Sequence, residues 1–154
     1  MNPLDCLEVP PEKETLMRLW TMLAHSQGGL LNAAKLGASL SLTGRTISNY
    51  INLLADLLMV RRLQPWHANT KKRIVKSPRI YVRDSGLVHA LLGLADFAQI
   101  AGHPVLGTSW EGFVIENLLA HAPERTHAGF YRTSAGAEID LLLQLPGKKK
   151  AVGN

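Results

Sequence analysis

The apolar positions at the start of the chain repeat with the spacing of a helix. Leu16, Leu19, Trp20 and Leu23 fall at i, i+3, i+4 and i+7, and acidic residues precede them in the first turn. The Gln-Gly-Gly sequence at 27–29 is typical of a helix end. The pattern therefore predicts a helix from about residue 12 to this point.

Two further helices are predicted after it, each opened by a capping residue. Asn32 suits the N-cap of a short helix over 33–38, and Thr43 suits the N-cap of the next.

The apolar stripe of this third helix consists of Ile47, Tyr50, Ile51, Leu54 and Leu58. Its opposite side carries Arg45, Ser48, Asn49 and Asn52. Two short helices with a polar outer face on the second match the helix-turn-helix pattern, and these side chains are of the types that read base edges. The alternative is a solvated face in a winged helix that binds protein.

Two extended segments follow, at 57–63 and 74–82, rich in β-branched residues and flanked by turn formers. They predict the wing of a winged helix. Between residues 61 and 83 the sequence holds eight basic residues and no acidic one. We expect this segment to face a polyanion, although basic rows also serve as solvated strand edges that prevent aggregation. The candidate nucleic-acid contacts here are Arg61, Arg62, Lys71, Lys72, Arg73 and Lys76.

The second half begins after a short helix capped by Asp84 or Ser85 and ending near Leu92. Residues 93–107 are predicted to be a loop between two modules. A stronger helix is expected from Thr108 or Ser109 to about His121, with Glu111 in its first turn. Along one side of it lie Trp110, Phe113, Val114, Asn117 and Leu118.

Two apolar runs joined by a Ser/Ala/Gly turn make up the stretch from Phe130 to Leu143, and they predict a pair of strands. Residues two apart share a face of a strand, so Glu138 and Asp140 are expected on one side, with Ile139 and Leu141 pointing into the sheet. Two carboxylates on one face are a common way to hold a hard divalent cation.

These segments together resemble the C-terminal region of a family of bacterial and archaeal AAA-type ATPases. The resemblance is carried by residues 42–54, 75–87, 107–119 and 130–143, and covers about 14–152. It implies an α+β fold, with a winged helix-turn-helix at 12–93 followed by an incomplete restriction-endonuclease-like (PD-(D/E)xK) half-domain at 104–154.

In such nucleases an acid on a helix, an Asp on a strand and a Glu-x-Lys pair hold a metal and activate water. The resemblance places Glu111 and Asp140 in the first two roles, with Glu116 and Glu138 as weaker candidates, of which Glu138 is counted with the metal ligands. No Glu-x-Lys follows Asp140, so we expect this half to be inactive and the chain to be a fragment or remnant of a longer protein. Mg²⁺ or Mn²⁺ is the cofactor of a completed site. The sequence has no Gly-rich phosphate loop, so no ATP site is predicted.

Composition limits the classes of protein to which the chain can belong. Over 154 residues the chain is 46% hydrophobic and 19% charged, with a net charge of +5 and one cysteine. These values fit an ordinary globular protein without a disulfide framework. The longest apolar runs are too short for a membrane span, so we expect a cytoplasmic protein with no membrane partner. The six histidines are scattered and predict no zinc site.

The leading hypothesis is a DNA-binding module without enzyme activity of its own. The first alternative is a protein-interaction tail that docks on an ATPase or on a second copy of the chain, through apolar side chains that the sheet leaves uncovered. The second alternative is a metal-dependent nuclease completed by residues from elsewhere.

Overall fold

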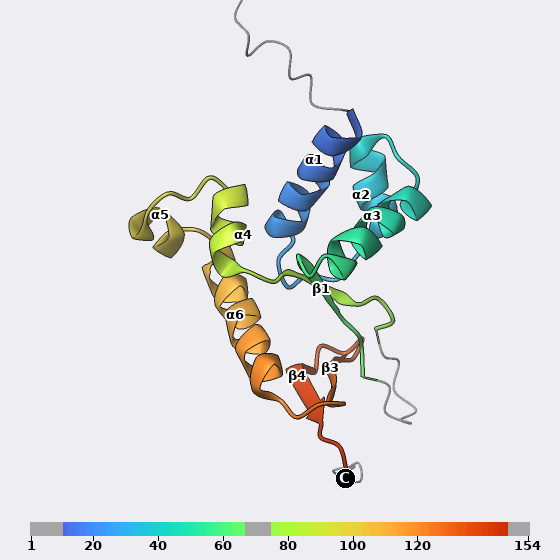
Figure 1. The fold of residues 1–154 in the computed structure, drawn as a ribbon, viewed down its shortest axis with the longest axis vertical. Helices are drawn as coiled ribbons and strands as arrows, with labels where there is room; N and C mark the ends of the chain where they lie inside the picture. The colour runs from blue at the N-terminus through green and yellow to red at the C-terminus, as the bar shows by residue number, and fades with distance from the viewer. Residues whose placement is uncertain (1–10, 67–74, 148–154) are drawn as a thin grey trace, which may run out of the picture.

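The computed structural model describes residues 11–66 and 75–147 (Figure 1). This part of the chain is a mixed α+β structure with six helices and two small antiparallel sheets. The helices are α1 (Pro11–His25), α2 (Ala33–Leu40), α3 (Gly44–Asp56), α4 (Ser85–Leu91), α5 (Phe97–Ala101) and α6 (Val105–His121). The strands are β1 (Val60–Leu63), β2 (Arg79–Val82), β3 (His127–Arg132) and β4 (Glu138–Gln144).

The predicted N-caps of the first helices are confirmed. The side chain of Asn32 accepts a hydrogen bond from the backbone N–H of Lys35, and that of Thr43 accepts one from Thr46. The same is true of Asp84, which caps α4 through Leu87. Each side chain satisfies a backbone donor that has no partner within its helix.

The turn between α2 and α3 is tight because of two local features. Ser41 adopts φ 56°, in the left-handed region, which reverses the chain after α2. A Cβ built on Gly37 would lie 2.5 Å from the carbonyl oxygen of Leu42, so only glycine permits this approach. The result is a compact pair of helices joined by three residues.

The first sheet is extended by the segment that follows α1. β1 and β2 pair from Val60 opposite Val82 to Leu63 opposite Arg79. On the other side of β2, the N–H of Gly28 bonds to the carbonyl of Ile80, and the side-chain amide of Gln27 bonds both backbone groups of Val82. Both edges of β2 are therefore occupied, and its side chains are buried in the cores on the two faces of the sheet.

The larger core lies between the first four helices and this sheet. Its buried members include Leu19 and Leu23 of α1, Ile47 and Ile51 of α3, and Val88 of α4. A smaller core joins the first sheet to the second half of the chain, and consists of Leu63, Tyr81, Ile115 and Phe130. Backbone hydrogen bonds between residues 64–66 and Phe130 strengthen this junction.

Several sequence predictions for the first half need correction. The strands are shorter than the predicted 57–63 and 74–82, and residues 67–74, with Lys71, Lys72 and Arg73, lie outside the described residues. Leu58 was expected on the buried stripe of the third helix, which is wrong. α3 ends at Asp56 and Leu58 adopts φ 60°, so its side chain turns outward and is 68% exposed.

The second half differs from the prediction in two ways. The expected loop at 93–107 contains α5, and α6 begins at Val105, earlier than predicted, so Glu111 is not in its first turn. The predicted apolar side of this helix mostly faces solvent: Trp110 is 64% and Phe113 44% exposed. The side that packs inward carries Val105, Ser109, Gly112 and Ile115.

The predicted strand pair at 130–143 is confirmed as an antiparallel pair, and it contains a bulge. Gly129 pairs with Leu142 and Tyr131 pairs with Ile139. Two residues of β4, Asp140 and Leu141, therefore lie opposite the single residue Phe130 in β3. A bulge interrupts the alternation of side chains along its strand. Leu141 packs against the smaller core as expected, whereas Ile139 is 48% exposed and does not.

Across the part of the chain described here, none of the helices combines the length and apolar composition that a membrane crossing requires.

Candidate functional site

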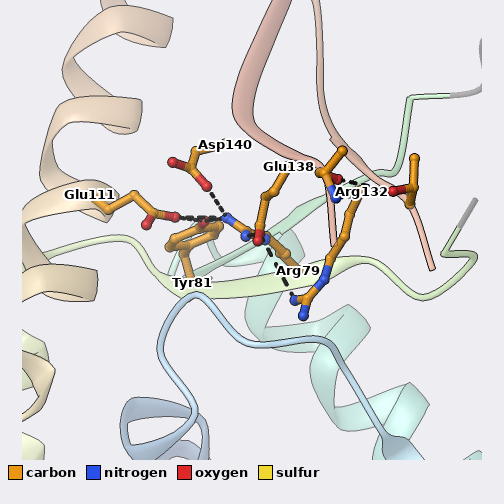
Figure 2. Close-up of polar contacts among 8 residues, drawn as sticks. Arg79, Tyr81, Glu111, Arg132, Glu138 and Asp140 are labelled. Carbon is orange, nitrogen blue, oxygen red and sulfur yellow. Dashed lines mark hydrogen bonds and ion pairs between the residues drawn. The ribbon is translucent and has the colours of Figure 1, made fainter. Parts of the chain in front are cut away.

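The acidic residues singled out by the sequence converge on a basic side chain from the other half of the chain. Arg79 begins β2, and its side chain is only 7% exposed. Its guanidinium contacts Glu111 of α6 and both Glu138 and Asp140 of β4 (Figure 2). The predicted metal ligands are thus brought together, and a guanidinium lies among them.

The contacts of Arg79 with Glu111 and Asp140 have the geometry of charge-assisted hydrogen bonds. Its Nη1 donates to Glu111 Oε1 at 3.0 Å and to Asp140 Oδ1 at 3.0 Å, while Nη2 pairs with Glu138. Nη1 also lies 3.3 Å from the hydroxyl of Tyr81. The guanidinium carbon stands 5.2 Å from the centre of the Phe130 ring, in the range of a cation–π contact. Arg79 therefore links β2, α6 and β4.

Local structure explains how the side chains around Arg79 come close to its guanidinium. Tyr81 is two residues from Arg79 on the same strand, so both side chains project to the same face. Glu111 precedes Gly112, and a Cβ on that glycine would lie 3.2 Å from the Tyr81 ring, so the missing side chain lets α6 approach β2. Asp140 lies in the bulge of β4, and its Oδ1 accepts a hydrogen bond from Arg79.

The electrostatics of the cluster favour the charged form of Arg79. Burial alone would lower the pKa of Arg79, but the hydrogen bond with Tyr81, the charge of Glu111 and the hydrogen bond with Asp140 raise it above the ordinary value. Burial, followed by the hydrogen bond to Glu111, raises the pKa of Tyr81, whose hydroxyl donates to that carboxylate. The phenol is neutral and the guanidinium charged across the physiological range.

The cluster as arranged does not fit a divalent cation. The oxygens of Glu111, Glu138 and Asp140 are turned to the guanidinium, which occupies the centre that a metal would need. Among residues 11–66 and 75–147, no group of three or more His, Cys, Asp or Glu side chains is positioned to hold a metal ion. We therefore derive no metal-dependent step from these residues.

A second ion-pair group uses two more arginines of the basic segment. Glu116 of α6 pairs with both Nε and Nη2 of Arg61, the latter at 3.0 Å, and accepts from Nε of Arg83 at 2.8 Å. Burial opposes the charge on Glu116, but hydrogen bonds from the two arginines lower its pKa below the ordinary value. Glu116, one of the two weaker sequence candidates, is thus part of the junction between β1, β2 and α6.

The outer face of α3 carries the remaining sequence candidates. Arg45, Asn49 and Asn52 are exposed, and Ser48 is half-buried with its hydroxyl bonded to the carbonyl of Gly44. Arg62 on β1 and Lys76 before β2 are also exposed. The face thus consists of polar side chains directed away from the core.

Sequence reasoning missed the most connected residue of the cluster. Arg79 was counted only as one of eight basic residues in an acid-free segment, and its acidic partners are 32 to 61 residues away in sequence. The position of Arg79 is a signal that could have identified it. Arg79 directly follows Pro78 and begins an apolar strand, and a charged side chain at such a position needs a partner.

Comparison with known proteins places the chain in a family. Residues 6–98, more than half of the chain, match the model of a domain of unknown function (DUF8612). The chain belongs to this family. Residues 106–152 match a second domain of unknown function (DUF4143), which is a C-terminal domain of AAA-ATPase-type proteins.

Two mycobacterial proteins are similar over most of the chain: "Uncharacterized protein Mb2031c" of Mycobacterium bovis and "Uncharacterized protein Rv2008c" of Mycobacterium tuberculosis. Each is 47% identical over 135 residues, which is 87% of this chain and 30% of the relative. The chain thus spans about 30% of the length of these relatives. No solved structure matches the chain.

Proposed function

We propose that this DUF8612 protein is a DNA-binding module in which α2 and α3 form a helix-turn-helix and α3 enters the major groove. The observation that carries the proposal is the two-sided character of α3. Ile47, Ile51 and Leu54 are buried on one side, while Arg45, Asn49 and Asn52 are exposed on the other. Arginine and asparagine can form paired hydrogen bonds with guanine and adenine edges, respectively.

The turn geometry supports this assignment. The three-residue connection with a left-handed Ser41 and the close packing at Gly37 hold α3 against α2. The paired strands β1 and β2 follow α3 directly, in the place of the wing of a winged helix. A rigid scaffold of this kind presents the outer side chains of α3 without further rearrangement.

The basic segment contributes less to this proposal than its sequence suggested. Arg61, Arg79 and Arg83 are engaged with acidic residues of the second half. Arg62 and Lys76 remain exposed for contacts with phosphates, and Lys71, Lys72 and Arg73 stay predictions. We therefore assign the sequence-specific contacts with DNA to α3, and only auxiliary contacts with phosphates to the wing.

Fluorescence anisotropy with a mixed-sequence duplex at low salt tests the proposal. Wild-type affinity should fall steeply as salt is raised, because counterions are released from the phosphates. A variant with Arg45, Asn49 and Asn52 all changed to alanine should bind at least ~10-fold more weakly. The matched control changes Arg18 and Asn117 to alanine. These residues are exposed on α1 and α6, and the control variant should bind DNA like wild type. Equal binding by both variants would contradict the assignment to α3.

A second candidate function, protein docking, is favoured by the exposed face of α6. Leu106 is 42% exposed and, by helical spacing, shares a face of α6 with Trp110 and Phe113, whose rings stack with centroids 5.4 Å apart. Exposed apolar groups of this size at helical spacing are typical of interaction surfaces. The occupant we favour is the ATPase-type module that accompanies DUF4143 in its family, because the mycobacterial relatives extend well beyond the matched segment.

Calorimetric titration of this chain into the remaining segment of a mycobacterial relative tests the docking function. Changing Trp110 and Phe113 to serine should abolish the heat of binding while leaving duplex binding unchanged. Changing exposed Leu58, which lies outside α6, is the control. If the serine variant binds as well as wild type, the α6 face is not the interface.

A further inference from the structure

A polar cleft of about 470 Å³ lies where β1 and the end of β2 meet the last turn of α6 and the start of β3. None of its lining residues belongs to α3, so the cleft is separate from the helix proposed to read DNA and shares with the proposed DNA contacts the auxiliary residue Arg62. Its charged and titratable lining residues are Arg61, Arg62, Arg83, Arg125, His127 and Glu124. Four arginines against one acidic residue give the cleft a positive lining.

The positive charge persists after the internal ion pairs are counted. Arg61 and Arg83 share the single carboxylate of Glu116, so one positive charge is left between them. Arg83 uses only its Nε in this contact, and its two terminal nitrogens have no hydrogen-bond partner among the described residues. Arg62 and Arg125 form no ion pair within the same part of the chain. This contrasts with Arg79, which faces three carboxylates.

The backbone at Arg125 provides a second, independent observation. Its φ of 66° lies in the left-handed region, which a side chain with a Cβ rarely adopts. The turn is held by Thr126, whose N–H and hydroxyl both bond to the carbonyl of Pro123. Arg125 thus contributes a long cationic side chain to the lining of the cleft from a backbone conformation that glycine would adopt without strain.

We infer that this cleft binds a phosphate group. The planar guanidinium pairs with phosphate oxygens in a bidentate manner, and several of them around one cleft fit a ligand with more than one phosphate. Two sources share this chemistry: a free polyphosphate, such as the phosphate chain of a nucleotide, and the backbone of a nucleic-acid strand. Glu116 competes with the phosphate, because an entering phosphate binds the same arginines as this carboxylate. Glu124, the acidic residue of the lining, limits the affinity.

Calorimetric titration with pyrophosphate at low salt tests the site. Arg125→Gly removes the guanidinium and relieves the backbone strain, so this variant should fold at least as well as wild type and bind about fivefold or more weakly. Glu116→Gln removes the competing charge and should tighten binding severalfold. Arg45→Ala, on α3, should leave pyrophosphate binding unchanged even if it weakens binding to a duplex.

A parallel titration uses a short single-stranded oligonucleotide without terminal phosphates. Binding of pyrophosphate that weakens in Arg125→Gly identifies a site for free polyphosphate. Binding of the oligonucleotide alone, weakened by the same change, identifies the backbone of a strand as the ligand. If neither probe binds saturably, or if Arg125→Gly binds as tightly as wild type, the inference is overturned. Failure of duplex binding by α3 variants has no bearing on this result.

Discussion

Replacing Arg79 by methionine tests whether its ion-pair cluster holds the two halves of the protein together. Methionine keeps most of the aliphatic length of the side chain and removes the guanidinium. Glu111, Glu138 and Asp140 then face one another without the cation that they contact in the wild type. The change therefore removes charge-assisted hydrogen bonds and leaves like charges close together.

The size of the effect follows from the exposure of each partner. Asp140 is 59% exposed, so its contact contributes at most ~1 kcal/mol in the presence of solvent screening. Glu111 and Glu138 have side-chain exposures of 27% and 31%, and each contact contributes about 1 kcal/mol, a screened value below that of fully buried charged hydrogen bonds. We therefore expect a loss of about 3 kcal/mol, which corresponds to a fall in Tm of roughly 6–12 °C for a chain of this size.

Thermal and urea denaturation followed by circular dichroism measure this loss. The control is Arg62→Met, because Arg62 lies on the adjacent strand β1 and is exposed. It should change stability by less than about 0.5 kcal/mol. If Arg79→Met melts within about 2 °C of this control, the cluster does not stabilise the junction and the reasoning from its contacts fails.

Three further changes probe other parts of the structure. Gly37→Ala should destabilise the protein by about 1–3 kcal/mol in urea denaturation, because its Cβ would lie 2.5 Å from the Leu42 carbonyl oxygen; a wild-type midpoint would show that the turn can relax. Thr43→Ala should cost about 1 kcal/mol through loss of the α3 cap, while Thr43→Ser should recover most of it, and equal midpoints for both would exclude the cap as the cause. Glu116 has a lowered pKa, so its stabilising contribution is present above the unfolded-state pKa and is lost as pH falls through the folded-state value. The stability difference between wild type and Glu116→Gln should therefore shrink from pH 7 to pH 3, and a constant difference would contradict the ion-pair origin.

Much of the first half was predictable because its signals are local. Asn32, Thr43 and Asp84 cap helices through backbone groups three residues away, and the apolar spacing of α1 and α3 identifies their buried faces. The errors occur where local patterns are ambiguous. Leu58 continues the spacing of α3 but lies beyond the end of the helix, where a left-handed residue redirects the chain.

The face of α6 could not be assigned from its pattern alone. Apolar residues occur on both sides of this helix, so periodicity does not indicate which side is buried. Small residues decide the matter: Ser109 and Gly112 allow α6 to approach α4 and β2, and the aromatic side chains of Trp110 and Phe113 are left on the other side.

The sequence by itself determined the first four helices, the caps of α2, α3 and α4, the antiparallel strand pair at the end, and the placement of Glu138 and Asp140 on one side of the last strand. It also indicated a likeness to the C-terminal region of AAA-ATPase-type proteins, which the match of residues 106–152 supports. Only the tertiary structure decided what the charges do. An acid-free segment looks like a surface for polyanions when charge is counted along the chain. Coulomb interactions depend on distance in space, and folding brings Glu111, Glu116 and Asp140 from the second half onto Arg79, Arg61 and Arg83. Three of the eight basic residues are thereby used to join the halves.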